Sequence, residues 1–456
     1  MCESAAVERS FDVVVLGAGP AGEVVAGRLG EAGLEVAIVE SHLIGGECSY
    51  YACMPSKALL RPGEVLAEAA RVPGVRASGP DVAAVLARRD EVIHDLDDSG
   101  QLPWLEEREI ALVRGHGRLD GERRVQVGDD VLVARRAVVV ATGSGAAMPP
   151  IPGLEGASPW SNREATTVKT APSSLVVLGG GVVGVELAQA WSSLGTRVAL
   201  VEGLERLISR EEPFASEQVG AALRSAGVEV RTGTKAVSVL RNGEVAVDLE
   251  DGSSVRGAEL LVAVGRRPAT QDLGLETIGL EPGKSIEVGE DLRSPEHPWL
   301  FAIGDVNGRS LLTHMGKYQG RLAADAILGK QVALRSDGAL SPRVIFTSPQ
   351  VAAVGHTLAS AEEAALRVRA VDVDSSGSAG ASFIGRKAPG TSRFVVDEDR
   401  RLIVGATFTG PEVAGWLHAA TIAVVAEVPL ETLWNAVPSF PTRSEVWLKL
   451  LEAYGL

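Results

Sequence analysis

Residues 11–40 read FDVVVLGAGPAGEVVAGRLGEAGLEVAIVE and carry a strong fold signal. Phe11–Leu16 is an apolar run that predicts a buried strand, and Gly17–Gly22 is a G-x-G-x-x-G turn. A helical pattern follows to about Ala32, and Val36–Val39 predicts a second strand that ends in Glu40. Such glycines let backbone N–H groups approach a pyrophosphate at a helix N-terminus, and the acid can accept from a ribose hydroxyl. The stretch predicts a βαβ unit that binds a dinucleotide; a glycine-rich turn without ligand is the alternative.

The same pattern returns in the middle of the chain. Leu175–Leu178 leads into Gly179–Gly184, then a helical stretch to Leu194, then Arg197–Val201 with Glu202 at its end. The last glycine and the terminal acid are 18 residues apart, as they are in the first unit. Two units of matched spacing predict two dinucleotides; one duplicated domain with a lost site is the alternative.

Glu202 bears on the choice of nucleotide. A carboxylate at the end of this strand accepts from a ribose 2′-OH and repels a 2′-phosphate, which an NADP site would pair with an Arg. Arg206 is near enough in sequence to compete with this interpretation. We predict NADH as the preferred nucleotide and NADPH as the weaker one.

Residues 45–57, GGECSYYACMPSK, hold two cysteines separated by four residues. A disulfide needs Cα atoms about 4.4–6.8 Å apart, slightly less than five helical steps span. We therefore expect Cys48 on an irregular lead-in to a helix and Cys53 in its first turns. The helix dipole there favours thiolate and redox reactivity. Two small buried hydrophobes are the alternative.

The rest of the chain alternates predicted strands, helices and loops. Charge-rich helical segments run to about residue 110, and Pro149–Gly153 reads as a linker. Further strands are predicted at Val125–Val133 (a hairpin turning at 128–130), Ala137–Ser144, Leu300–Val306, Arg343–Phe346, Arg393–Val396 and Leu402–Phe408, and Ala263–Pro268 is expected to close the second dinucleotide unit. Further helices are predicted at Thr313–Leu328, Pro411–Val425 and Ser444–Tyr454, with a domain boundary around 331–340.

Composition narrows the functional classes. The chain has 456 residues, a formal net charge of -15 and three cysteines. The charge argues against nucleic acid and anionic membrane as partners, and no apolar run reaches the length of a membrane span. Met1–Ser10 lacks the apolar core of a signal peptide. We expect a cytoplasmic, reducing location, in which a disulfide is catalytic, and assign no role to Cys2.

Together these motifs resemble the flavin-dependent pyridine nucleotide–disulfide oxidoreductases, the group of dihydrolipoamide dehydrogenase, glutathione reductase and mercuric reductase. The resemblance covers essentially the whole chain and rests on Gly17–Gly22 with Glu40, Cys48–Cys53 with Pro55-Ser56-Lys57, Ala141-Thr142-Gly143, Gly179–Gly184 with Glu186, Gly304-Asp305, and Pro441-Thr442-Arg443-Ser444-Glu445. It implies an α/β fold with two Rossmann-like dinucleotide-binding domains and a C-terminal α+β dimerisation domain. The implied boundaries are 1–147 with 268–338 for FAD, 148–267 for NAD and 339–456 for dimerisation.

The resemblance also implies cofactors and residue roles. FAD is expected in the first unit and NADH in the second, with contacts from Gly17, Gly19, Gly22, Glu40, Gly46, Thr142, Gly143, Gly179, Gly181, Gly184, Glu202, Gly265, Gly304 and Asp305. Asp305 would bond the ribityl chain. Cys53 would be the charge-transfer thiol and Cys48 the interchange thiol. Lys57 would lie near flavin N5, paired with Glu186 beside the nicotinamide. No metal site is expected.

The tail departs from the family pattern. The family carries His-Pro-Thr-x-x-Glu, whose His is the acid–base partner of the interchange thiol and is held by the Glu. Here Phe440 stands at the His position, while Glu445 is retained. A positioned acid–base group contributes about 10²–10⁴-fold. His314 and His418 are interpreted as structural rather than as substitutes. No cysteine follows Cys53, so the C-terminal cysteine pair of mercuric reductases is missing and mercury is not expected as the substrate.

Three functions remain from the sequence. The first is a homodimeric NADH-dependent FAD oxidoreductase that passes electrons through flavin and the Cys48–Cys53 disulfide to an unidentified disulfide or dithiol. The second is a reductase that passes electrons from flavin directly to a quinone or another small acceptor, with Phe440 lining an apolar pocket. The third is a flavin-loaded binding or redox-sensing protein.

Overall fold

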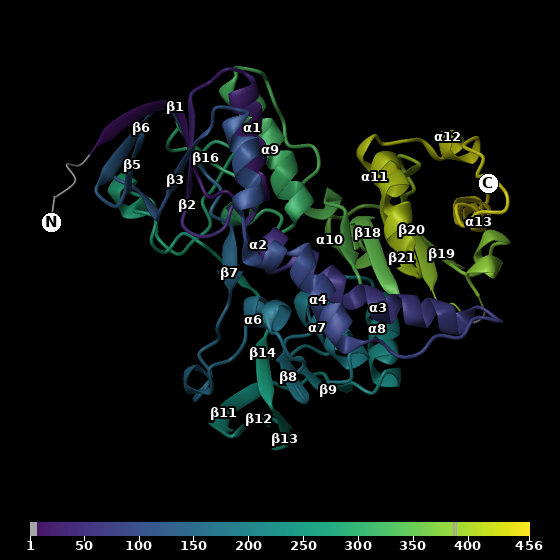
Figure 1. Ribbon diagram of the computed structural model, residues 1–456. Coiled ribbons are helices and arrows are strands. Elements are labelled where there is room, and N and C mark those ends of the chain that lie inside the picture. Colours follow the sequence, from purple (N-terminus) through teal and green to yellow (C-terminus); the bar gives the residue numbers. More distant parts are fainter. Residues whose placement is uncertain (1–6, 386–387, 389) are drawn as a thin grey trace. The chain divides into compact units, whose positions relative to one another are not determined.

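The computed structural model describes residues 7–385, 388 and 390–456, so Cys2 lies outside the described residues (Figure 1). The chain divides into two compact units. The first comprises Met1–Met54, Asp90–Ala146 and Arg266–Gly338, and the second comprises Pro55–Arg89, Ala147–Gly265 and Ala339–Leu456. Helices α3 (Cys53–Arg71) and α4 (Val82–Val92) cross the boundaries between these segments.

The first unit is built on a mainly parallel sheet. Its strands are β1 (Glu8–Leu16), β2 (Val36–Glu40), β3 (Ala111–Arg114), β4 (Gly117–Leu119), β5 (Arg124–Val127), β6 (Asp130–Val140) and β16 (Leu300–Ala302), in the order β3-β2-β1-β6-β5-β4 with β16 also on β6. Beside it, β7 (Ser144–Ala146) pairs antiparallel with β15 (Arg266–Pro268). Val13–Leu16 are fully buried because parallel neighbours and covering helices enclose the strand.

The helices of the first unit are α1 (Pro20–Glu31), α2 (Gly46–Tyr50), α5 (Leu102–Glu106) and α9 (Thr313–Ile327). Helices α1 and α9 lie side by side (Figure 1). Small residues bring them together, since a Cβ added at Gly320 would lie 2.8 Å from the Ala21 carbonyl oxygen. This contact places the first turn of α1 against the middle of α9.

The second unit contains the second dinucleotide pattern. Its parallel sheet has the order β10-β9-β8-β14, made by β8 (Ser174–Leu178), β9 (Arg197–Val201), β10 (Glu229–Arg231) and β14 (Glu259–Val262). An antiparallel meander follows, made by β11 (Ala236–Asn242), β12 (Glu244–Leu249) and β13 (Ser254–Gly257). The helices are α6 (Asn162–Thr167), α7 (Val182–Ser193) and α8 (Pro213–Ser225).

The C-terminal part of the second unit is an antiparallel sheet with helices. The sheet order is β17-β18-β21-β20-β19, made by β17 (Arg343–Ile345), β18 (Gln350–Gly355), β19 (Val368–Asp374), β20 (Thr391–Asp397) and β21 (Leu402–Gly410). The helices are α10 (Leu358–Glu363), α11 (Leu417–Val425), α12 (Leu430–Trp434) and α13 (Glu445–Tyr454). A buried ion pair joins this sheet to α8, because Arg393 Nη1 lies 2.9 Å from Glu212 Oε2.

The predicted fold class is confirmed, and three local expectations need correction. Cys48 lies within the short helix α2 rather than on an irregular segment, because Gly45 and Gly46 both take positive φ and start a helical turn. The hairpin strand and the buried strand predicted after it are one strand, β6, which pairs in parallel with β1 from Val131 to Val140 and antiparallel with β5 over its first residues. Strands β18 and β19 were not predicted: β18 is buried throughout and so lacks alternation.

Candidate active site

The two cysteines of the redox motif belong to consecutive helices in the first unit's part of the chain. Cys48 lies in α2 and Cys53 is the first residue of α3, and both are partly buried thiols. The Cys53 sulfur lies 3.4 Å from the hydroxyl oxygen of Thr313, the first residue of α9. Thr313 was not anticipated from the sequence, and its place at the start of a predicted helix was the available signal.

The surroundings of Cys48 keep its thiol protonated, because its pKa is raised. A hydrogen bond with Cys53 and burial raise the pKa of the Cys48 thiol, and the Thr313 hydroxyl and Lys317 oppose the rise. Only Cys53 occupies the first position of a long helix, where the dipole favours negative charge. The raised pKa keeps the proton on Cys48, which lies within hydrogen-bonding reach of Cys53.

The first glycine turn leaves a cradle at the N-terminus of α1. Gly17 has φ +99°, and a Cβ on Gly22 would lie 1.9 Å from the Gly17 carbonyl oxygen, so no other residue fits there. An added Cβ on Gly19 would meet no heavy atom within 4 Å. Gly19 caps α1, and its free side faces the positive end of the helix dipole. The residues fit a pyrophosphate.

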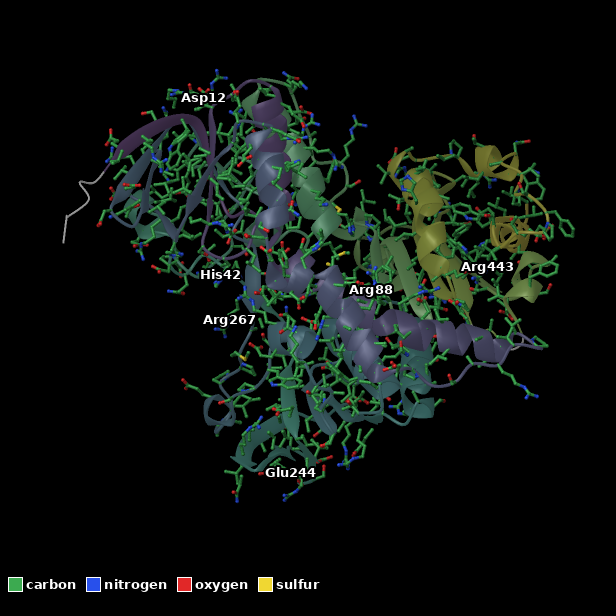
Figure 2. All side chains as sticks on the ribbon, in the orientation of Figure 1. Asp12, His42, Arg88, Glu244, Arg267 and Arg443 are labelled. Atoms are coloured by element: carbon green, nitrogen blue, oxygen red, sulfur yellow. The ribbon has the colours of Figure 1, made fainter. Side chains whose placement is uncertain are left out.

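Glu40 closes this cradle from the end of β2. Its Oε2 accepts from the Ala18 N–H at 2.8 Å, and its Oε1 accepts from the His42 N–H at 2.7 Å. His42 is labelled in Figure 2. Each carboxylate oxygen has a second lone pair, so the fixed acid can still accept from ribose hydroxyls.

Gly46 ties the cysteine motif to the glycine turn. It has φ +58°, and a Cβ there would lie 2.9 Å from Gly19 Cα. The lead-in to Cys48 therefore packs directly on the turn that caps α1. This contact explains why the motif needs a glycine at this position.

Thr142, Gly143 and Gly304 hold loops of the same unit. Thr142 Oγ1 donates to the Ala269 carbonyl at 2.9 Å, and the Ala269 N–H donates to the Gly143 carbonyl at 2.9 Å. Gly304 has φ +76°, and its N–H donates to Gln319 Oε1 at 2.7 Å. These bonds fix the two loops through backbone groups.

Asp305 belongs to a polar network that sequence reasoning missed. Its Oδ2 accepts from Ser144 Oγ at 2.5 Å and lies 3.6 Å from Arg266 Nε. Arg266 Nε also donates to Ser144 Oγ at 2.6 Å. The predicted ribityl partner is thus oriented by two neighbours, and its remaining lone pairs are what a hydroxyl could use.

The second glycine turn repeats the geometry of the first. Gly179 has φ +106°, and a Cβ on Gly184 would lie 1.8 Å from its carbonyl oxygen. Gly181 caps α7 and, like its counterpart in the first turn, has nothing within 4 Å of an added Cβ. Gly265, with φ +149°, is equally open. The second unit also fits a dinucleotide.

Glu202 and Arg206 play different parts beside this turn. Glu202 Oε2 accepts from the Gly180 N–H at 2.5 Å, and its Oε1 accepts from the Leu204 N–H at 2.8 Å. The Arg206 guanidinium donates to the carbonyls of Glu211 and Ser209 and to the Ser216 hydroxyl. Arg206 is therefore engaged in holding its own loop.

Lys57 and Glu186 form an ion pair in the second unit. Lys57 Nζ donates to Glu186 Oε2 at 2.7 Å, and the Phe346 N–H donates to Glu186 Oε1 at 2.9 Å. The carboxylate is buried, while the Lys57 side chain is 34% exposed and lies over the Phe346 ring. Lys57 follows Cys53 by four residues on α3, so both lie on one face of that helix.

The tail presents Phe440 to solvent and holds Glu445. Phe440 is 76% exposed, and Val437 close by is 83% exposed. Glu445, the first residue of α13, accepts from the Gly380 N–H at 3.0 Å. Arg443 lies in this C-terminal region (Figure 2), with its guanidinium 4.1 Å from the Trp416 ring centre; burial lowers its pKa to about 10.

Within residues 7–385, 388 and 390–456, no cluster of three or more His, Cys, Asp or Glu side chains could hold a metal ion. In the same part of the chain, no helix is both long and apolar enough to cross a membrane.

Comparison with known proteins places these residues in context. Residues 11–320 match the family described as pyridine nucleotide-disulphide oxidoreductase, and residues 341–451 match its dimerisation domain. Dihydrolipoyl dehydrogenase 3 of Pseudomonas aeruginosa is 32% identical over 460 residues, which cover 96% of each chain. Mercuric reductase of Shigella flexneri is 32% identical over 456 residues, covering 96% of this chain and 79% of that protein.

A solved structure shares the fold. The HOCl-induced flavoprotein disulfide reductase RclA from Escherichia coli superposes with a TM-score of 0.86 at 23% identity. The match covers 97% of this chain and 99% of that chain.

Proposed function

The chain belongs to the pyridine nucleotide-disulphide oxidoreductase family, and we propose that it is an NADH-dependent flavoenzyme that reduces a disulfide substrate through Cys48 and Cys53. The observation that carries this proposal is the placement of the two thiols on the consecutive helices α2 and α3, with the Cys53 sulfur 3.4 Å from the hydroxyl of Thr313. Two neighbouring thiols can exchange with a substrate disulfide and close into a disulfide of their own.

The family is FAD-dependent and uses pyridine nucleotides. We assign FAD to the cradle of Gly17–Gly22 with Glu40, and NADH to that of Gly179–Gly184 with Glu202. The open caps of α1 and α7 support both assignments. FAD, when bound, accepts a hydride from a nicotinamide and delivers an electron pair to a disulfide. The boundaries of the FAD, NAD and dimerisation domains stay a prediction.

Cys53 is assigned as the thiol next to the flavin and Cys48 as the thiol that meets the substrate. Lys57 supplies a positive charge one helical turn from Cys53, and Glu186 holds that charge in place. A cation there favours an electron-rich cofactor ring. The Phe346 N–H fixes Glu186 in turn, so the ammonium has a defined position.

The exchange itself needs only the two thiols and a substrate disulfide. Cys48 gives its proton to water and its sulfur bonds to one substrate sulfur while the substrate S–S bond breaks, and the departing thiolate takes up a proton from water. The Cys53 thiolate then bonds to Cys48 and releases the second substrate thiolate, which is protonated by water. Two electrons pass from the dithiol to the substrate, and the enzyme disulfide is formed.

We further infer a homodimer. The chain carries the family's dimerisation domain, and Ile422, Trp434, Val437 and Phe440 expose apolar side chains there. Such a surface is typical of an interface between copies. Phe440 is proposed to approach the partner's cysteine pair, where an apolar ring replaces the acid–base His of the family pattern. The cytoplasmic location stays a prediction.

The exposed, non-ionisable Phe440 favours one alternative, direct reduction of a quinone or another small acceptor by the flavin. In that case the dithiol is auxiliary and the ring contributes apolar contact. The substrate panel should therefore contain both disulfides and quinones.

Cys48→Ser separates the two functions. NADH oxidation by the FAD-loaded variant is measured with each acceptor, and Cys2→Ser serves as the matched control for a cysteine without an assigned role. Loss of turnover with Cys48→Ser alone is the expected result. Full turnover by this variant with a quinone would replace the disulfide route by the direct one.

A further inference from the structure

Phe440 stands where the family has its acid–base histidine, so a different group would have to assist Cys48 during exchange. Helix α9 of the same chain carries a positively charged residue, Lys317. Thr313 begins α9 and lies 3.4 Å from the Cys53 sulfur. Lys317 follows Thr313 by four residues, so its side chain projects from the same face one turn further along. That face therefore carries an ammonium group one helical turn beyond the residue that contacts Cys53.

Helix α1 places the carboxyl group of Glu23 near Lys317. A Cβ on Gly316 would lie 3.3 Å from Ala21 Cβ, and one on Gly320 would lie 3.3 Å from Val24 Cβ. The two glycines flank Lys317 on α9, and Ala21 and Val24 flank Glu23 on α1. The close approach of the helices, which Figure 1 shows side by side, brings Glu23 and Lys317 into one cluster.

The charges in this cluster act on one another. Burial raises the pKa of Glu23 to about 7, and Lys317 from α9 opposes the rise while Glu40 from β2 adds to it. Tyr50 of α2 also faces Glu23, and burial and nearby carboxylates raise its pKa. Lys317 in addition opposes the rise that Cys53 and burial cause in the pKa of Cys48. Lys317 is thus the cation shared by Glu23 and Cys48.

We propose that Lys317 is the charge partner of Cys48 within its own subunit. This inference rests on the proposed role of Cys48 as the thiol that meets the substrate. When Cys48 loses its proton to water, the Lys317 ammonium stabilises the thiolate that attacks the substrate disulfide. The same charge stabilises the departing substrate thiolate until water protonates it. Lys317 thereby takes over part of the work of the absent tail histidine.

The test is the pH dependence of Cys48 alkylation in the FAD-loaded protein after chemical reduction. Iodoacetamide labels the thiols, and mass spectrometry of the peptides separates Cys48 from Cys53. Because a neighbouring opposite charge shifts a pKa by about one unit or more, Lys317→Met should move the Cys48 profile upward by about one pH unit. Lys317→Gln is a second neutral variant, and Lys317→Arg keeps the charge and should restore the wild-type profile.

Arg321→Met is the matched control, since Arg321 lies on the same helix one turn further from the cysteines. It should leave the Cys48 profile in place. An unshifted profile in both neutral variants, or an equal shift in Lys317→Arg, would overturn the proposal. The readout needs no turnover, so it is independent of the acceptor experiment. If Cys48→Ser retains turnover while Lys317→Met shifts the profile, the disulfide function fails and the charge assignment stands.

Discussion

Glu202→Ala should change which pyridine nucleotide the enzyme uses. In the wild type, both Glu202 oxygens are fixed by the N–H groups of Gly180 and Leu204, so the carboxylate cannot swing away from an approaching 2′-phosphate. Arg206, the nearby cation, is committed to two carbonyls and the Ser216 hydroxyl. The wild type should therefore favour NADH, and removing the acid should remove the repulsion.

The size of the effect follows from Coulomb's law. Two unit charges about 6 Å apart at an effective dielectric constant of about 20 repel by about 3 kcal/mol. Glu202 is half-buried, so salt and solvent reduce this value to about 1.4 kcal/mol, which is about tenfold in kcat/KM. We expect at least that preference for NADH in the wild type, and a rise of about tenfold in the NADPH to NADH ratio in Glu202→Ala.

Steady-state kinetics with both nucleotides measure the ratio, normalised to bound FAD. Glu40→Ala is the control, because Glu40 has the same place in the first unit and accepts from the equivalent backbone N–H. It should weaken FAD retention and leave the NADPH to NADH ratio unchanged. Equal or better use of NADPH by the wild type, or a ratio within twofold of wild type in Glu202→Ala, would refute this account of Glu202.

Four further changes test other parts of the structure. Cys53→Ser should still bind FAD but should lack the long-wavelength thiolate-to-flavin absorption band that two-electron reduction produces in the wild type. A wild type that shows no such band and retains two free thiols when oxidised would contradict the assignment of Cys48 and Cys53 as a redox pair. Phe440→His should raise turnover with small dithiols or disulfides in a homodimer; an unimproved variant, or a monomer by light scattering, contradicts the placement of that ring. Gly22→Ala should lower the unfolding temperature of the apoprotein, because the added Cβ would lie 1.9 Å from a carbonyl oxygen. Gly19→Ala should leave the stability of the apoprotein unchanged and weaken FAD binding in titrations. Equal unfolding temperatures of the two variants would count against the turn geometry. Glu23→Gln should stabilise the protein at pH 8 and not at pH 5. The pKa of the Glu23 carboxyl rises from 4.5 to about 7 on folding, so the folded state of the wild type loses stability as the pH rises through that window, by about 1–2 kcal/mol after discounting for partial exposure. Melting curves of both proteins at both pH values check this expectation.

Local patterns were enough to predict much of the fold. The two glycine turns lie where predicted, because a backbone that needs positive φ and a Cβ-free contact tolerates few other residues. The strands β1 and β8 were found from continuous apolar runs, which two covered faces require. These features depend on neighbours in sequence, and sequence records such neighbours directly.

Parts of the C-terminal sheet were not predicted, because their sequences carry little or no local periodicity. Strand β18 has no polar side to reveal its period, since β17 and β21 enclose it. Strand β19 does alternate Val with Asp at Val371–Asp374, and that weak pattern was the only sign of it. The strand that closes the hairpin, β6, also belongs to the parallel sheet. Its place in that sheet depends on β1, which is distant in sequence and therefore leaves no local signal.

In the candidate site, residue types came from sequence and partners came from folding. The Lys57–Glu186 ion pair was expected only through family resemblance, and the Phe346 N–H that completes it lies 160 residues from Glu186. The local sequence gives no sign of three other features: the hydrogen bonds that engage Arg206, the raised pKa of Cys48, and the proximity of Lys317 to Glu23. Hydrogen bonding, burial and charge act through space, so they are set when distant segments of the chain pack together.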